Sequence, residues 1–244
     1  MIALFTDFTL NGPYVGQLHA VLAQLAPQVR VLDLMHDAPR CDPRAASCLL
    51  PRILDVLPET ALVVAVVDPG VGDPARRPVI LEADGRCLVG PDNGLLSRVA
   101  QAARETRWWH ITWRPPRLSD SFHGRDLFAP VAAHLANGTP PAELAEPLHA
   151  PLHAQVPVDL YEVVYVDAFG NLVTGITAGA LSDAARLAIG NQAIGHARTF
   201  SDVAEGALMW YRNSMGLVEI AQNRASAAAT LDCAIGTPLR VLDN

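Results

Sequence analysis

Short, fully apolar runs alternate with polar loops through the first half of the chain. Residues 61–67 form an uninterrupted apolar run rich in β-branched side chains, and residues 2–5 form a shorter one. Runs without polar alternation are typical of strands buried on both faces of a parallel sheet. Between them, apolar residues recur at helical spacing over Tyr14–Leu25. The first half is therefore predicted to be an α/β domain with a largely parallel sheet flanked by helices.

Turn residues delimit the remaining elements of this half. Pro43 suits the first turn of a helix over 42–56, because a helix leaves that backbone N–H unpaired in any case. The turn at residues 83–85 separates two apolar runs, which predicts a β-hairpin with arms at 79–82 and 86–89. The other predicted elements are strands at 29–34 and 107–113 and helices at 95–103 and 127–136.

The pattern changes after a segment rich in Pro, Ala and His at residues 139–157, which is the predicted linker. Short strands at regular spacing then predict a smaller antiparallel, barrel-like or sandwich-like β domain. These strands are expected at 160–166, 172–176, 186–189, 194–199, 207–211, 217–221 and 238–242. The predicted domains are residues 1–148 and residues 149–244.

Composition narrows the classes of protein that the chain can belong to. A formal net charge of −7 argues against nucleic acid as a partner. No apolar run reaches the roughly 18 residues that a membrane span needs, so a cytoplasmic location is expected. The four cysteines form no CxxC pair, and all 18 basic residues are Arg. Without Lys, neither a Schiff base nor a P-loop of the GK[ST] type can form.

Polar side chains follow the predicted strands of the first half. They are Asp7, Asp68, Asp92 with Asn93, and His123 with Asp126. Each carboxylate by itself is compatible with a capping role. Because loops at the carboxyl ends of parallel strands meet at one edge of a sheet, a shared site is the favoured interpretation. Two chemistries fit: a divalent metal site, or an Asp–Arg–His set that orients a water molecule without metal.

Ordered motifs in both halves resemble a known family. They are TDF and PYVG near the start, VDPGVG at 67–72, PDNGLL at 91–96, FHGRD at 122–126, DAFGN at 167–171 and NSMG at 213–216. Together they are similar to the SAM hydroxide adenosyltransferases, the hydrolytic relatives of the fluorinase and chlorinase. The resemblance implies attack of water on ribose C5′ of S-adenosyl-L-methionine (SAM), giving adenosine and L-methionine. SAM is then the substrate, and neither a cofactor nor a metal is expected.

The resemblance assigns Asp68, Arg76 and His123 to the orientation of the attacking water. Arg77 is an alternative to Arg76, because the GDPARR segment is one residue longer than expected. The halogenases differ by an aromatic residue in place of Asp68 and by a long insertion before the PDNG-like loop. Here residues 78–90 hold only a tight hairpin, so both differences favour hydrolysis.

Substrate contacts are implied in the same way. Asp7 resembles the carboxylate that holds the ribose diol, and Tyr14 would form a pocket wall. Asp167 and Ser214 would bind the ammonium and carboxylate of the methionine part. Asn171 and Phe200 would bind adenine. The other expected substrate-binding residues are Asp92, Asn93, Phe169, Glu219 and Asn223.

Three departures from the family pattern lie near the expected substrate: Thr9 in TDFT, Gly175, and Met215. The resemblance also implies a homotrimer, with active sites between the first domain of one subunit and the second domain of its neighbour. Two rival functions remain open. One is a metal-dependent nucleoside or phosphoester hydrolase using Asp7, Asp68, Asp92 and His123, and the other is a non-catalytic SAM or adenosine sensor.

Overall fold

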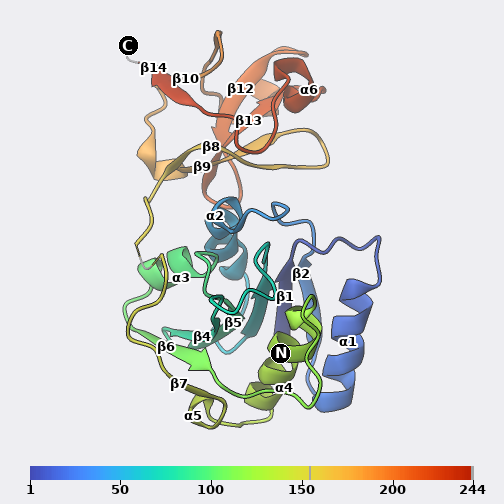
Figure 1. The fold of residues 1–244 in the computed structure, drawn as a ribbon. Helices are drawn as coiled ribbons and strands as arrows, with labels where there is room; N and C mark the ends of the chain where they lie inside the picture. The colour runs from blue at the N-terminus through green and yellow to red at the C-terminus, as the bar shows by residue number, and fades with distance from the viewer. Residues whose placement is uncertain (154, 243–244) are drawn as a thin grey trace. The chain divides into compact units, whose positions relative to one another are not determined.

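A computed structural model describes residues 1–153 and 155–242 and divides the chain into two compact units, Met1–Val156 and Pro157–Asn244 (Figure 1). The first unit is built on one seven-stranded sheet in the order β2-β1-β3-β5-β4-β6-β7. Its strands are β1 (Ile2–Thr6), β2 (Val31–Met35), β3 (Leu62–Val66), β4 (Pro78–Ala83), β5 (Arg86–Pro91), β6 (Thr106–Ile111) and β7 (Ala145–Pro147).

The sheet is mixed rather than largely parallel. Strands β2, β1, β3 and β5 pair in parallel, whereas β4, β6 and β7 add antiparallel pairs beyond β5. The predicted α/β class is confirmed, and the antiparallel part begins at the predicted hairpin. Thus the central strands β1 and β3 are fully buried, as their unbroken apolar runs require.

Helices cover both faces of this sheet (Figure 1). Alternate apolar residues of β1 and β3, such as Leu4 and Val64, pack against Leu18 of α1 and Val131 of α4 in one core. The helices of the unit are α1 (Tyr14–Leu25), α2 (Pro43–Leu54), α3 (Ser97–Ala102), a π-helical turn η1 (Gly124–Phe128), α4 (Ala129–Ala136) and α5 (Pro141–Leu144). Asp42 caps α2 by accepting the N–H of Ala45, which explains why this helix begins at Pro43.

The linker expectation for residues 139–157 is wrong for its first part. Residues 141–147 form α5 and β7, and β7 pairs with β6 as the edge strand of the sheet. A composition rich in Pro and Ala resembles a linker, but Pro also begins short helices and tolerates edge strands.

The second unit consists of two small antiparallel sheets that share one core. The four-stranded sheet has the order β12-β13-β9-β8 and the three-stranded sheet the order β11-β10-β14. Leu172 and Ile220 of the first sheet pack with Leu187 and Ile194 of the second. The elements are β8 (Leu160–Val166), β9 (Leu172–Thr177), η2 (Ala178–Ala180), β10 (Arg186–Ile189), β11 (Gln192–Ile194), η3 (Phe200–Asp202), β12 (Leu208–Arg212), β13 (Leu217–Gln222), α6 (Ala227–Leu231) and β14 (Arg240–Leu242).

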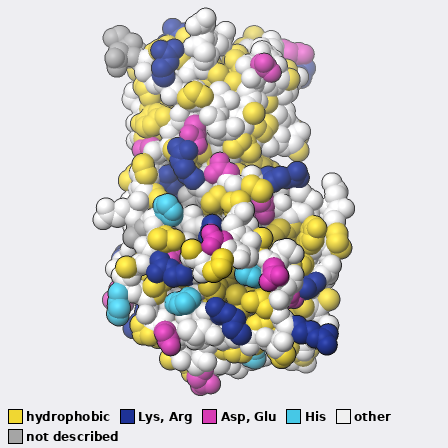
Figure 2. Space-filling model, viewed as in Figure 1, with side chains coloured by type: hydrophobic (Ala, Val, Ile, Leu, Met, Phe, Trp, Pro, Cys, Tyr) yellow, Lys and Arg dark blue, Asp and Glu magenta, His cyan; other side chains and the backbone are white. Residues whose placement is uncertain are grey.

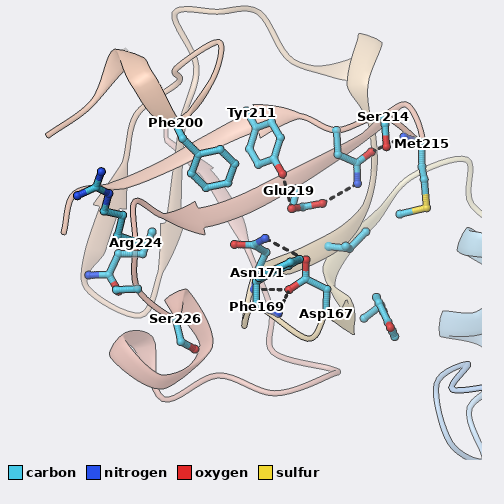
Figure 3. A pocket seen from close by; sticks show the side chains of 15 residues that line it. Asp167, Phe169, Asn171, Phe200, Tyr211, Ser214, Met215, Glu219, Arg224 and Ser226 are labelled. Atoms are coloured by element: carbon cyan, nitrogen blue, oxygen red, sulfur yellow. Dashed lines mark hydrogen bonds between the residues drawn. The ribbon is translucent and has the colours of Figure 1, made fainter. Parts of the chain in front are cut away.

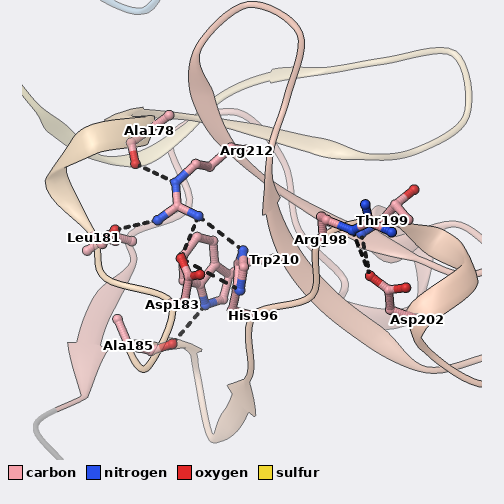
Figure 4. Close-up of polar contacts among 10 residues, drawn as sticks. All are labelled: Ala178, Leu181, Asp183, Ala185, His196, Arg198, Thr199, Asp202, Trp210 and Arg212. Atoms are coloured by element: carbon pink, nitrogen blue, oxygen red, sulfur yellow. Dashed lines mark hydrogen bonds and ion pairs between the residues drawn. The ribbon is translucent and has the colours of Figure 1, made fainter.

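The strand expected at 194–199 is wrong, because β11 ends at Ile194 and His196 forms only an isolated bridge to Trp210. Arg212 instead organises this region (Figure 4). Its guanidinium donates to the carbonyl oxygens of Ala178 and Leu181 at 3.0 and 2.8 Å and pairs with Asp183 at 2.7 Å. Arg212 therefore fastens the connection between the two sheets to β12.

Surface charge agrees with the composition. Figure 2 shows arginine and acidic side chains interspersed on the face that it presents, without a broad basic area. Among the described helices, none combines the length and apolar character needed to cross a bilayer.

Candidate active site

Asp68 follows the carboxyl end of β3, where the buried apolar strand gives way to a Pro-Gly turn. Its Oδ1 atom accepts hydrogen bonds from the Arg76 guanidinium at 2.7 Å and from the Gly70 N–H at 3.2 Å. The side chain is only 4% exposed. Its Oδ2 atom is buried and has no hydrogen-bond partner among the described residues. This oxygen is the unsatisfied acceptor at the sheet edge, which a bound water could satisfy.

The environment of Asp68 raises the proton affinity of its carboxylate. Burial raises the pKa of its carboxyl group, and the charge of Arg76, the Gly70 hydrogen bond and His123 lower that pKa only in part. A carboxylate with a raised pKa is a better proton acceptor than an ordinary exposed one.

A small cavity of about 70 Å³ adjoins this carboxylate. Asp7, Asp68 and His123 line it together with apolar side chains that include Phe8 and Phe122. Such a volume accommodates one or a few water molecules and is too small for a nucleoside. Asp68 and His123, both predicted from the sequence, therefore line a cavity large enough for a water molecule, the expected nucleophile.

The structure also separates the two candidate arginines. Arg76 pairs with Asp68, whereas Arg77 donates to Asp92 at 2.6 Å and to the carbonyl oxygen of Ala150 at 3.0 Å. The other oxygen of Asp92 accepts the N–H of Leu152 at 2.9 Å. Both oxygens of Asp92, whose side chain is 1% exposed, thus bind protein donors. This geometry favours Arg76 as the arginine of the water site.

Asn93 supports Asp68 indirectly. Its amide donates to the carbonyl oxygen of Val67 at 2.8 Å, and its side-chain oxygen accepts the N–H of Leu95 at 3.2 Å. Asn93 therefore ties the residue before Asp68 to the loop after β5.

Gly70 leaves space for the guanidinium of Arg76. A Cβ atom at Gly70 would lie 2.2 Å from a terminal nitrogen of Arg76. We therefore expect Gly70→Ala to displace this guanidinium from Asp68 and to lower activity about tenfold or more, since a charge-assisted hydrogen bond is lost. Thermal unfolding should change little, because the clash involves only the end of a flexible side chain. Steady-state kinetics with a melting curve would check both, and unchanged kinetics would contradict the predicted displacement.

Asp7 lies in the neighbouring loop after β1, and Tyr14 is the first residue of α1 after that loop. Asp7 follows β1, is half-buried, and accepts the N–H of Cys41 at 2.9 Å. Burial raises the pKa of its carboxyl group, with the Cys41 hydrogen bond and the charge of Arg40 acting in the opposite direction. Tyr14 is 49% exposed and packs edge-on against Phe122 with 5.2 Å between ring centroids. Asp7 therefore lines the water-sized cavity directly, whereas Tyr14 packs behind Phe122, which also lines it.

The second unit carries a much larger pocket of about 860 Å³ (Figure 3). Six of the seven residues predicted to bind substrate in this unit line it, namely Asp167, Phe169, Asn171, Phe200, Ser214 and Glu219. Phe169 is 80% exposed, and Phe200 contacts the ring of Tyr211 with centroids 5.5 Å apart. A pocket of this size with aromatic walls and several polar groups suits a nucleoside-sized ligand.

The loop between β8 and β9 is organised by Asp167. Its Oδ1 atom accepts the N–H groups of Phe169 and Asn171 at 2.9 and 2.8 Å, and its Oδ2 atom accepts the Asn171 amide at 2.9 Å. Asp167 therefore orients the Asn171 side chain as well as lining the pocket.

Glu219 is a buried carboxylate on β13 that also lines this pocket (Figure 3). It accepts the Tyr211 hydroxyl at 2.5 Å and the Asn213 amide at 2.8 Å. Burial, followed by the hydrogen bond to Glu219, raises the pKa of the Tyr211 hydroxyl. Tyr211 therefore stays protonated, and the three side chains form a fixed polar floor.

Asn223 does not line the pocket. Its amide donates to the carbonyl oxygen of Val203 at 2.9 Å, so it ties the turn after β13 to the segment that follows η3. Several further residues that line the pocket were not expected to bind substrate, and all of them except Asn213 of the NSMG motif lie outside the motifs. These are Tyr165, Val173, Tyr211, Asn213, Gln222, Arg224, Ala225 and Ser226.

Asp7, Asp68 and His123 share the small cavity, but Asp92 is engaged elsewhere with Arg77 and Leu152. Among the described residues, no three His, Cys, Asp or Glu side chains come together in a group that could hold a metal ion. The four-ligand arrangement of the rival metal hypothesis is therefore not assembled in the described part of the chain.

The site combines a carboxylate, a guanidinium and an imidazole beside a water-sized cavity. It lies on an α/β domain that is followed by a β domain, and such a set of groups is suited to activating water. The chain belongs to the SAM hydroxide adenosyltransferase family. The family's N-terminal domain matches residues 2–145 and its C-terminal domain matches residues 161–240.

Individual relatives agree with this assignment. An (R)-S-adenosyl-L-methionine hydrolase of Salinispora arenicola is 40% identical over 98% of this chain and 97% of its own length. A fluorinase of Actinopolyspora mzabensis is 24% identical over 99% of this chain and 96% of its own. An uncharacterized conserved protein of Thermotoga maritima has a similar structure, with a TM-score of 0.89 and 30% identity over 99% of this chain and all of that one.

Proposed function

We propose that this protein hydrolyses SAM to adenosine and L-methionine by attack of water on ribose C5′. The observation that carries the proposal is the buried, unpartnered oxygen of Asp68 beside a water-sized cavity that His123 also lines. The full-length similarity to a protein named (R)-S-adenosyl-L-methionine hydrolase supports the same reaction.

The chemistry explains why these residue types suffice. The sulfonium of SAM is a good leaving group, so the C5′–S bond breaks with its electron pair moving to sulfur and no acid is required. The difficult partner is water, whose pKa in bulk is about 15.7. As the C5′–O bond forms, Asp68 accepts a hydrogen bond from the water and takes up the proton that the water loses, while Arg76 and His123 hold the water oxygen and the carboxylate in position. The proton then leaves to solvent.

The remaining assignments belong to the same proposal. Asp7 holds the ribose diol, because a carboxylate accepts two adjacent hydroxyls well, and Tyr14 forms the wall beside it. Asp167 and Ser214 bind the methionine part, and Asn171 and Phe200 bind adenine. SAM is the substrate, and no resident cofactor takes part. Asp92, Asn93 and Asn223 act by positioning loops, according to the hydrogen bonds described above.

The assembly and location also remain predictions. Since the water site and the larger pocket lie in different units, a homotrimer that combines the first unit of one subunit with the second unit of its neighbour would complete a site. The expected location is the cytoplasm. Sedimentation analysis of the purified protein should give a species of three chains, and a monomer with full activity would contradict this arrangement.

The direct test is incubation of chelator-treated protein with SAM, followed by chromatography of the products. Adenosine and methionine in a one-to-one ratio support the proposal. Turnover only after a divalent ion is restored would favour the metal-dependent hydrolase. Bound SAM without any adenosine would favour the sensor.

The raised pKa of Asp68 predicts a pH dependence. The carboxylate must be ionised to accept from water, so kcat/KM should fall as the pH drops through this pKa, with a midpoint above the ordinary value of 3.8. Removal of the Arg76 charge, as in Arg76→Met, takes away a cause that lowers the pKa and should move the residual acid limb to higher pH. A profile of kcat/KM with circular dichroism at each pH checks this. A shift of the limb to lower pH in that variant would contradict the assignment.

A further inference from the structure

A series of hydrogen-bonded polar side chains, buried at Thr6 and His36 and partly exposed at Asp33 and His19, lies beside the first loop of the site. The Thr6 hydroxyl, at the end of β1, lies 2.7 Å from Nδ1 of His36. Nε2 of His36 lies 3.0 Å from Oδ1 of Asp33 on β2, and the same oxygen lies 2.7 Å from Nε2 of His19 on α1. Thr6 is 0% and His36 5% exposed, so this contact is shielded from water. Neither Thr6 nor His36 has a role in the reaction described above.

The groups that can donate or only accept determine the direction of each hydrogen bond in this series. An ionised carboxylate only accepts, so Nε2 of His36 donates to Asp33 and, in the neutral ring, Nδ1 is an acceptor. The Thr6 hydroxyl then donates to Nδ1 and uses its lone pairs to accept the N–H of Phe8, which lies at 3.2 Å. Burial would raise the pKa of Asp33, but the hydrogen bonds from His36 and His19 outweigh it and keep that pKa below its ordinary value. Asp33 is therefore the ionised end that orients His36.

The order Thr–His–Asp is that of a nucleophilic triad, but the geometry assigns another task. Thr6 is fully buried and its hydroxyl is already used twice, so it is not accessible to a substrate. Its acceptance of the Phe8 N–H closes a local turn with Asp7 as the middle residue.

Further contacts from the same segment hold this turn. The His36 carbonyl oxygen accepts the N–H of Thr9 at 2.6 Å, and the Thr6 carbonyl oxygen accepts the N–H of Ala38 at 3.2 Å. Thr9 has a φ of +60°, which is costly for a β-branched residue and must be maintained by such contacts. The segment then reaches Cys41, whose N–H binds the Asp7 carboxylate.

We propose that His36, oriented by Asp33, is a positioning residue that acts through the Thr6 hydroxyl to fix the turn from which Asp7 meets the ribose diol. The inference rests on the proposed function only through the assignment of Asp7 to the ribose. It accounts for a buried histidine and a half-exposed aspartate that no step of the hydrolysis uses.

The test measures nucleoside recognition rather than turnover. Calorimetry of the full-length protein gives dissociation constants for adenosine and for 2′,3′-dideoxyadenosine, which lacks the diol. The wild-type protein should prefer adenosine, and Thr6→Val should reduce this preference about tenfold, the effect of one buried hydrogen bond. Thr6→Ser should retain it, because the hydroxyl is kept. Asp33→Asn, at a half-exposed position, should also reduce this preference, because the amide orients His36 less firmly than the carboxylate.

His134→Gln is the matched control, since this half-buried histidine packs against the ring of Trp113 with centroids 5.4 Å apart and does not take part in the Thr6–His36–Asp33 contacts. It should leave the preference unchanged. A merely structural role of Thr6 would weaken both nucleosides equally, and that result would overturn the inference. A wild-type protein without preference for adenosine would overturn it as well. If wild-type protein prefers adenosine and Thr6→Val loses that preference but SAM is not hydrolysed, the proposed reaction fails and the positioning inference stands.

Discussion

Replacement of Asp68 by asparagine is expected to reduce kcat for SAM hydrolysis by about 10²–10⁴-fold, the usual effect of removing a positioned proton acceptor. Asparagine preserves the shape of the side chain and still accepts from Arg76, but its amide does not accept a proton from water. Binding of SAM should change little, because Asp68 acts on the nucleophile. Separate measurement of kcat and of the SAM dissociation constant distinguishes these effects.

Asp73→Asn provides the matched control for that variant. Asp73 lies in the same loop and is exposed, and among the described residues its side chain accepts the N–H of Ala75 alone, at 2.8 Å. We expect Asp73→Asn to retain wild-type kinetics. An Asp68→Asn protein with more than about a tenth of wild-type kcat would contradict the role of Asp68 as the acceptor.

The neighbouring arginines are expected to give opposite phenotypes. Arg76→Met should lower kcat about 10²–10³-fold, comparable to the loss of one preorganised donor in an active site, with little change in stability. Arg77→Met should leave Asp92 as a buried charge without its partner and destabilise the first unit by about 3 kcal/mol. Its kcat, measured below the unfolding transition, should stay within a fewfold of wild type.

Thermal unfolding and kinetics of the two variants, recorded side by side, test this division. The variants are matched controls for each other because the same charge and nearly the same side-chain volume are removed at adjacent positions. The opposite result would be a stable Arg77→Met protein with a low kcat and an Arg76→Met protein with a normal kcat. That result would assign the water site to Arg77 and refute the role given to the pair of Arg76 and Asp68.

Much of the fold follows from local sequence pattern. The unbroken apolar run before Asp68 predicts a doubly buried strand, and β3 occupies the interior of the sheet. The periodicity over Tyr14–Leu25 predicts α1 with the same ends. Local patterns fail where strand pairing decides the structure, as at residues 194–199. After Ile194 this segment makes only an isolated bridge to β12, in which the Trp210 N–H donates to the carbonyl oxygen of Gly195 and the Ala197 N–H donates to that of Trp210.

The candidate site was predictable only in part. Strand-end positions identify Asp7 and Asp68, because the topology of a parallel sheet brings such positions together. Spacing alone leaves Arg76 and Arg77 equivalent, since the loop path that directs one guanidinium to Asp68 and the other to Asp92 depends on tertiary contacts. The contact between Thr6 and His36 joins residues 30 positions apart and carries no local motif.

The central claim is that an activated water attacks C5′ of the ribose. Metal-free protein incubated with SAM in water enriched in oxygen-18, followed by mass spectrometry of the adenosine, tests it most directly. We predict one label in the 5′-hydroxyl of adenosine, formed with wild-type protein and lost with Asp68→Asn. Adenosine formed without the label, or labelled adenosine formed equally by Asp68→Asn, would contradict the account.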